Sequence, residues 1–307
     1  MKNGLALLIF CVIIPQSLLF PANKSTLSIY GLVETDIAYT SNLVHKNSLD
    51  LYLPFAHKFP VILFIHGGSF VSGDRKDFPY AQIGENFQKN GIACALMSYR
   101  LSTDSVWPAQ PRDVAKAFLW LKENIGQYGG DSTKIFIVGH SAGGHLAALV
   151  CTDSTYFAEV GLKLSEIEGC VSMGAMMSDA GSLSSLSKEQ EQRLFRHDWF
   201  FKIFGNKKDF LNSLPIHHVN SAMPRTLLLL ADEERYDPPK EQTVLEFVES
   251  AKQKNVHVEY EVLSHRSHMG TVEKMAEQSD PTMERIITFI EHDTQYRRSD
   301  RSELFFH

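Results

Sequence analysis

The sequence predicts an α/β fold with a mostly parallel central sheet and helices on both faces. Runs of β-branched and aromatic residues alternate along the chain with stretches of helical length, and the connections between them are short. The run at 61–65 is almost uniformly apolar, which is typical of a strand covered on both faces. In such sheets the ligand site lies at the carboxyl ends of the strands.

The elements follow one another from residue 25 onward. Segment 25–53 predicts two or three strands, because residues 36–39 and 49–53 alternate apolar and polar side chains as half-buried edge strands do. Further strands are expected at 61–65, 92–99, 135–138, 168–175 and 227–230, and at 256–263. Helices are expected at 77–90, 109–128, 144–151, 241–252 and 283–292, and the last dozen residues as a loosely held tail. Segment 176–223 breaks the alternation, and we expect it to be an inserted, partly helical lid over the site.

Composition limits the classes of protein and partner. The 307 residues, 44% hydrophobic and 21% charged, suit one large domain, which we place at 23–307. A formal charge of −6 gives no basic footprint, so nucleic acid is not an expected partner. Cys94, Cys151 and Cys170 lie in or beside apolar stretches without metal-ligand spacing, and we expect them to be buried free thiols.

The N-terminus differs from the rest of the chain. Lys2 precedes an apolar run at 4–14, and residues 1–22 have the length and flanks of a secretory signal peptide. The run lacks a clear cleavage site, so an uncleaved N-terminal anchor is the alternative, with membrane association through this segment. Asn23 begins a glycosylation sequon. We expect entry into the secretory pathway, as a protein that is secreted or anchored in the endoplasmic reticulum or another membrane.

The pentapeptide Gly139-His-Ser-Ala-Gly143 carries the strongest chemical signal. It lies between the strand expected at 135–138 and a helix rich in small residues, which is the context of a nucleophile elbow. A tight turn there exposes the serine, and only glycines let the strand and helix approach closely enough. The pattern predicts that Ser141 is a nucleophile.

A serine hydroxyl needs a base and an acid that orients this base. The elbow predicts the chain order serine, acid, histidine. After the last strand, His265 and His268 are both candidates, and we favour His268 because it lies farther into the loop. The segment 231–239 offers four carboxylates. Among these, Glu234 has the usual distance from the strand, whereas Asp237 has the usual chemistry and a rigid Pro-Pro behind it.

Acyl transfer also requires hydrogen-bond donors for the oxyanion that forms on attack. The segment His66-Gly-Gly-Ser-Phe70 follows the strand at 61–65 and can bring its backbone close to a substrate. We expect the amides of Gly68 and Ser69 to converge with that of Ala142 to form an oxyanion hole.

Four motifs give the chain a resemblance to a known group. Residues 66–70, 98–101, 111–113 and 139–145 resemble the esterase/lipase α/β-hydrolases, and most closely the hormone-sensitive-lipase-like and kynurenine-formamidase-like branch. The resemblance extends over 36–292 and implies the α/β-hydrolase fold. It implies a triad of Ser141, His268 and an acid, for which the local likeness of Asp237-Pro-Pro favours Asp237 over Glu234. The spacing of the acid loop departs from the branch and fits Glu234 better.

These observations predict a serine hydrolase that cleaves a carboxylic ester, or a related amide, through an acyl-enzyme. No metal and no organic cofactor is required. The segments 173–177 and 199–201 are expected either to line a pocket for an apolar or aromatic group of a small-molecule substrate, or to fill the core. The alternatives are an arylformamidase or a prenylcysteine methylesterase. An alternative of another class is a non-catalytic binding module on the same fold.

Overall fold

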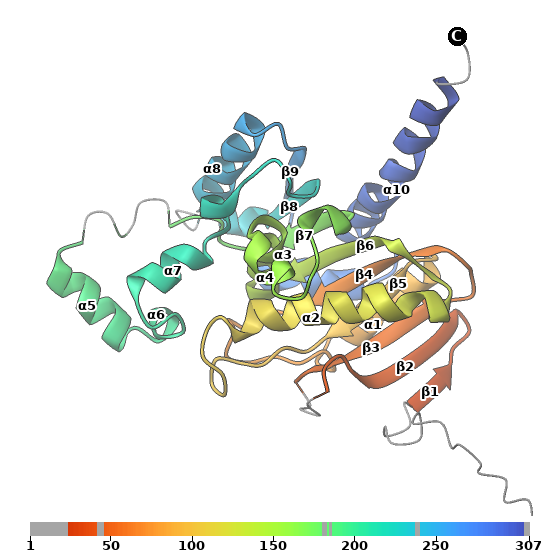
Figure 1. Cartoon of the computed structure of the whole chain (residues 1–307), viewed down its shortest axis with the longest axis horizontal. Helices are drawn as coiled ribbons and strands as arrows, with labels where there is room; N and C mark the ends of the chain where they lie inside the picture. Colours follow the sequence, from red (N-terminus) through yellow and green to blue (C-terminus); the bar gives the residue numbers. More distant parts are fainter. Residues whose placement is uncertain (1–23, 42–45, 180–182, 184–185, 237–239, 304–307) are drawn as a thin grey trace, which may run out of the picture.

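A single mixed sheet forms the centre of the protein (Figure 1). The structure is a computed structural model, which describes residues 24–41, 46–179, 183, 186–236 and 240–303. The described strands of the sheet lie in the order β1-β2-β3-β5-β4-β6-β7-β8-β9. The strands β1 to β3 pair antiparallel, whereas β5, β4 and β6 to β9 run parallel. The strand bounds are β1 Lys24–Leu27, β2 Gly31–Ala38, β3 Ser48–Pro54, β4 Phe59–Ile65, β5 Ala93–Met97, β6 Gly130–His140, β7 Gly169–Met173, β8 Thr226–Ala231 and β9 Val258–Leu263.

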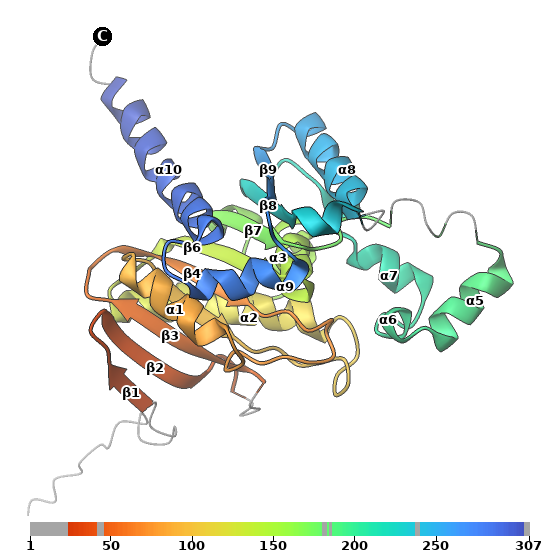
Figure 2. The ribbon, with the colours of Figure 1, turned by 180° about the vertical axis from the view of Figure 1, so that it is seen from behind.

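Helices cover both faces of the sheet. The helices α2 and α3 cross the face seen in Figure 1. The helices α1 and α9 and the start of α10 lie on the opposite face, seen in Figure 2, and the rest of α10 projects away from the sheet. The bounds of the α-helices are α1 Tyr80–Lys89, α2 Ala109–Asn124, α3 Ala142–Thr152, α4 Ser154–Ala158, α5 Lys188–His197, α6 Trp199–Lys202, α7 Lys207–Ser213, α8 Lys240–Gln253, α9 His268–Glu273 and α10 Pro281–Glu303. The 3-10 turns are η2 Ile125–Tyr128, η3 Leu164–Glu166, η4 Pro215–His218, η5 Asp232–Tyr236 and η6 Lys274–Ala276.

The strand β4 shows why its sequence lacks alternation. Leu63 belongs to the apolar cluster that includes Phe118 of α2 and Leu149 of α3. The neighbouring Phe64 belongs to the cluster on the other face, with Phe87 of α1. Because both faces of β4 are covered, each position along it is apolar. The predicted α/β class with helices on both faces is therefore confirmed, and the solved structures compared below agree with it.

Some boundaries differ from those that the sequence predicts. The strand β6 begins at Gly130, before the apolar run, and α10 continues to Glu303 through the expected tail. The short helix α9 occupies a stretch expected to be a loop. It begins after Ser267, whose side chain accepts a hydrogen bond from the Gly270 N–H as an N-cap. A six-residue helix is too short to produce a hydrophobic period, so only its cap marks it in the sequence.

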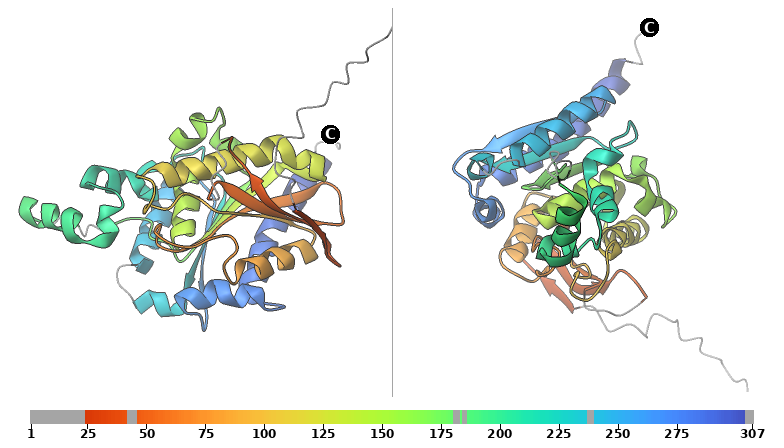
Figure 3. Two further views of the ribbon diagram at one scale, coloured as in Figure 1. Left: turned by 90° about the horizontal axis from the view of Figure 1, so that it is seen from below. Right: turned by 90° about the vertical axis from the view of Figure 1, so that its left-hand side faces the viewer.

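Segment 176–223 connects β7 to β8 and carries α5, α6 and α7. In Figures 1 and 3 these helices project beyond the sheet rather than covering one of its faces. Aromatic rings hold them together, and the ring of Phe204 also lies 4.9 Å from that of Trp107 in the main body. The rings that contact one another in this segment are Phe195, Trp199, Phe200, Phe201, Phe204 and Phe210.

The predicted leader at 1–22 lies outside the described residues. Within the described part of the chain, no helix combines the length and the apolar character needed to cross a membrane. Cys94, Cys151 and Cys170 are buried free thiols, as expected.

Candidate active site

Ser141 stands in the turn between β6 and α3. Its backbone has φ 58° and ψ −121°, a region that residues with side chains rarely occupy and that the surrounding structure must enforce. Its N–H donates to the Met173 carbonyl at 2.8 Å. A Cβ atom on Gly143 would lie 2.1 Å from the Ile65 carbonyl oxygen, so this position excludes any side chain. The elbow therefore has the strained serine and the close helix–strand approach that its sequence predicts.

The imidazole of His268 reaches Ser141 from the first turn of α9. Its Nε2 lies 2.9 Å from Ser141 Oγ, which is the distance of a hydrogen bond donated by the hydroxyl. The neighbouring His140 fixes the backbone here, because its Nε2 donates to the His268 carbonyl at 2.8 Å. Burial lowers the pKa of His140 to about 3, so this ring is neutral at physiological pH. His265, the other candidate base, is exposed and does not line the cavity that contains Ser141.

The carboxylate against His268 is that of Glu234. Its Oε1 lies 2.6 Å from His268 Nδ1, and its Oε2 accepts the Ala231 N–H at 3.1 Å. Only 5% of the Glu234 side chain is exposed. Burial by itself raises the pKa of this carboxyl, but hydrogen bonds from His268 and Lys240 outweigh it and lower the pKa to about 2. Glu234 is therefore ionised at neutral pH.

The other carboxylates of this loop have other positions. Asp232 accepts the His265 N–H at 2.6 Å and the Arg266 N–H at 2.8 Å, so it ties the acid loop to the histidine loop. Glu233 is exposed. Asp237, the acid that the resemblance favours, lies outside the described residues. Of the described carboxylates, the one that contacts His268 is Glu234, the alternative that the spacing favours.

The expected oxyanion loop lies beside the elbow. Gly68 has φ +114°, and a Cβ atom there would lie 2.1 Å from the Ser72 carbonyl oxygen. Ser69 has a positive φ of 52°, which turns the chain sharply. Ser69 and Ala142 both line the cavity that contains Ser141, whereas Gly68 does not. Neither the Ser69 nor the Ala142 amide donates to another described residue, so both are available to a substrate oxygen.

The cavity at Ser141 has a volume of about 180 Å³. Its lining comes from the oxyanion loop, the elbow, the end of β7, α6 and the starts of α8 and α9. The lining residues are Ser69, Phe70, Ser141, Ala142, His145, Gly174, Ala175, Met176, Phe200, Lys240 and His268. The two segments expected as pocket or core divide between these roles. Met176 and Phe200 line the cavity, Met173 and Met177 are buried in the core, and the exposed Trp199 does neither.

Two further lining residues shape the site, and nothing in the sequence indicates the second of them, Lys240. Nδ1 of His145 donates a hydrogen bond to the Met176 carbonyl at 3.0 Å. Burial lowers the pKa of His145 to about 4, so its ring forms an uncharged part of the cavity lining at neutral pH. Lys240, the first residue of α8, forms an ion pair with Glu234. No motif marks this lysine, because the contact depends on how α8 begins after the acid loop.

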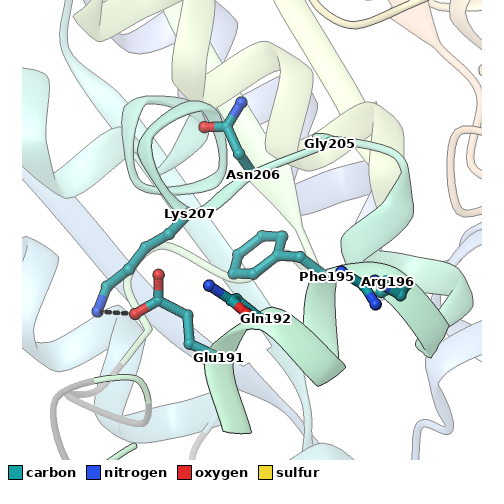
Figure 4. A pocket seen from close by; sticks show the side chains of 7 residues that line it. All are labelled: Glu191, Gln192, Phe195, Arg196, Gly205, Asn206 and Lys207. Atoms are coloured by element: carbon teal, nitrogen blue, oxygen red, sulfur yellow. Dashed lines mark hydrogen bonds and ion pairs between the residues drawn. The ribbon is translucent and has the colours of Figure 1, made fainter. Parts of the chain in front are cut away.

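A second hollow, of about 390 Å³, lies between α5 and the turn that precedes α7. Figure 4 shows Phe195 at its centre and an ion pair between Glu191 and Lys207 at its edge. It is larger than the cavity at Ser141, but it contains none of the residues of the elbow, the acid loop or α9. The smaller cavity, which Ser141 and His268 line, is therefore the candidate active site.

The fold and the site define an α/β-hydrolase. A truncated carbohydrate esterase from gut microbiota superposes with a TM-score of 0.70 at 19% identity, over 87% of this chain and 97% of the other. Esterase B from Lactobacillus rhamnosis superposes with a TM-score of 0.67 at 20% identity, over 88% of this chain and 88% of the other. At such low identity these structures establish the shared fold alone.

The chain belongs to the BD-FAE family, whose profile matches residues 49–247. It is 36% identical to Esterase LipC of Mycobacterium tuberculosis over 104 residues. These residues make up 33% of this chain and 26% of LipC. The chain is 26% identical to the probable isoprenylcysteine alpha-carbonyl methylesterase ICME of Oryza sativa subsp. japonica over 187 residues. These residues make up 60% of this chain and 45% of ICME. The chain thus spans less than half the length of these two relatives.

Proposed function

We propose that this chain is a serine hydrolase that cleaves carboxylic esters through an acyl-enzyme, with Ser141, His268 and Glu234 as its triad. One observation carries the proposal: a continuous hydrogen-bonded chain links Ser141 Oγ, both nitrogens of His268 and Glu234 Oε1, at 2.9 Å and 2.6 Å. A non-catalytic binding module has no need of this alignment, nor of a serine held in strained backbone geometry. The esterase relatives support the same reaction class.

The proton path follows from the hydrogen bonds. As Ser141 Oγ attacks the ester carbonyl carbon, its proton moves to His268 Nε2, and the imidazolium that forms is stabilised by the carboxylate of Glu234. Collapse of the tetrahedral intermediate breaks the bond to the alcohol oxygen, which takes the proton from Nε2. Water then loses a proton to the same nitrogen, attacks the acyl group and releases the carboxylic acid.

We infer that the oxyanion of each intermediate binds the amides of Ser69 and Ala142, because both residues line the cavity and neither amide has an acceptor among the described residues. The sharp turn at Gly68 and Ser69 aims the loop at this position. The role of Gly68 is therefore to shape the turn, and its own amide is the least favoured of the three expected donors. Loss of one oxyanion donor typically costs about 100- to 1000-fold in turnover.

The cavity favours a small substrate. Its volume of about 180 Å³ lies below the roughly 300–1,000 Å³ of pockets that enclose drug-sized ligands. Phe200 and Met176 offer apolar surface, so we infer a short acyl or alcohol group of apolar character. The likeness to ICME makes a prenylcysteine methyl ester the second candidate substrate, although its long chain would have to extend outside the cavity.

A fluorophosphonate probe tests the proposal, because it forms a covalent bond with an activated serine. Wild type should be labelled and should hydrolyse 4-nitrophenyl butyrate, whereas Ser141→Ala should do neither. His268→Ala should label far more slowly, and His265→Ala is the matched control that should label normally. Labelling that survives Ser141→Ala would exclude this nucleophile. Parallel assays with N-formylkynurenine and a prenylcysteine methyl ester separate the arylformamidase and methylesterase alternatives.

We also propose that residues 1–22 direct the chain into the secretory pathway. The apolar run after Lys2 and the sequon at Asn23 support this. Translation with microsomes should protect the chain from added protease and attach a glycan that Asn23→Gln removes. Full digestion of the chain outside the membranes would contradict the proposal.

A further inference from the structure

Lys240 brings a positive charge to the candidate site. It begins α8, lines the cavity together with Ser141 and His268, and ion-pairs with Oε1 of Glu234. That oxygen also accepts the hydrogen bond from His268 Nδ1. About a quarter of the lysine side chain, 24%, is exposed, so Lys240 is both a partner of the buried acid and an accessible part of the cavity lining.

This lysine changes the net charge that a substrate meets. A serine–histidine–carboxylate triad with a neutral imidazole has a charge of −1, which disfavours a second anion nearby. Here the ammonium of Lys240 cancels the carboxylate of Glu234. Burial keeps His140 and His145 neutral, so these rings add no charge at neutral pH. Among the described lining residues, Lys240 is the one with a permanent charge. The others are apolar, small or hydroxylic, apart from His145 and His268.

The ammonium also has capacity for another partner. A lysine has three N–H donors, and one hydrogen bond within the described residues, to Glu234, is assigned to it. A carboxylate in the cavity could accept a second one without displacing the first. Phe70, Met176 and Phe200 offer no competing acceptor.

We propose that Lys240 is a specificity-determining residue that admits esters carrying a carboxylate near the scissile bond. This inference rests on the proposed esterase function and names the class of substrate within it: a small ester of a dicarboxylic acid, or of an alcohol that bears a carboxylate. A charge-assisted hydrogen bond of this kind corresponds to about tenfold or more in affinity.

Two pairs of esters test the inference and show on which side of the ester the carboxylate lies. For the acyl side, monomethyl succinate is compared with methyl 4-methylpentanoate, in which an isopropyl group replaces the carboxylate at similar size. For the alcohol side, 4-acetoxybenzoate is compared with 4-acetoxybenzamide. The readout is the ratio of kcat/KM for the anionic ester to that for the neutral one. A general effect of a substitution on the triad cancels in this ratio.

Lys240→Met should lower the ratio about tenfold in one of the two pairs, and Lys240→Arg should keep it within threefold of wild type. Lys252→Met, an exposed lysine on the same helix, is the matched control and should leave both ratios unchanged. A fall of less than threefold in both pairs with Lys240→Met would overturn the inference. If wild type hydrolyses none of the four esters and not 4-nitrophenyl butyrate either, the proposed function itself fails instead.

Discussion

Replacing Glu234 by glutamine should remove most of the activity while preserving the shape of the site. The imidazolium that forms during attack lies against a carboxylate whose Oε1 is 2.6 Å from Nδ1. Two unit charges about 4 Å apart interact by about 4 kcal/mol at an effective dielectric constant of about 20. Since about 1.4 kcal/mol corresponds to a tenfold change in rate, kcat/KM should fall about 1000-fold. The amide also offers one oxygen to three donors, His268, Lys240 and the Ala231 N–H, so part of the orientation is lost as well.

The assay is hydrolysis of 4-nitrophenyl butyrate under kcat/KM conditions, with thermal unfolding to verify that Glu234→Gln is folded. The matched control is Glu233→Gln, because Glu233 belongs to the same loop but is exposed. Asp237→Asn should stay within about threefold of wild type, because Nδ1 of His268 has one proton to donate and Glu234 accepts it. A loss of less than tenfold with Glu234→Gln, or an equal loss with Asp237→Asn, would refute the assignment of the acid.

Three further predictions concern the elbow, acid stability and the cavity. Gly143→Ala should destabilise the protein by at least about 3 kcal/mol in urea unfolding, because a Cβ there overlaps a strand carbonyl. Burial lowers the pKa of His66 to about 4, of His140 to about 3 and of His145 to about 4. Below about pH 6.5 the three histidines therefore bind protons in the unfolded chain but not in the folded chain. The free energy of unfolding should fall as the pH drops from 6.5 toward 4, by up to about 4 kcal/mol per pH unit for the three rings together. Phe200→Ala should enlarge the cavity and raise kcat/KM for a 4-nitrophenyl octanoate relative to the butyrate by about fivefold or more.

Each of these predictions has an outcome that contradicts it. A fully stable Gly143→Ala protein would mean that the helix and strand do not approach as closely as described. Equal unfolding free energies at pH 7 and pH 5 would show that the three histidines take up protons in the folded state. An unchanged preference for acyl chain length in Phe200→Ala would remove α6 from the substrate site.

The sheet and the elbow could be predicted because their signals are local. An apolar run of strand length and a serine between closely spaced glycines each restrict the backbone directly, and β4 and Ser141 lie where these patterns place them. His268 could be chosen over His265 from its depth in the loop alone. The short helix α9 that presents it could not, since six residues carry no period.

The acid could not be chosen from the sequence, because four carboxylates lie within six residues and their order does not say which one faces the imidazole. The turn η5 decides this by sending Asp232 toward the amides of the histidine loop and Glu234 toward the imidazole. The resemblance favoured Asp237, whereas the chain spacing favoured Glu234. The sequence does not mark Lys240 for a related reason: its position beside Glu234 depends on where α8 starts, and no motif indicates that residue.

The most direct test of the account is to trap the acyl-enzyme. Wild type is mixed with a slowly deacylating ester, quenched in acid within milliseconds and digested, and the peptide that contains Ser141 is identified by mass. One acyl group per chain should form on Ser141 as one equivalent of alcohol is released, and this acyl group should form more slowly in Glu234→Gln. Alcohol release without any acylated peptide, or an acyl group on another residue, would contradict the account.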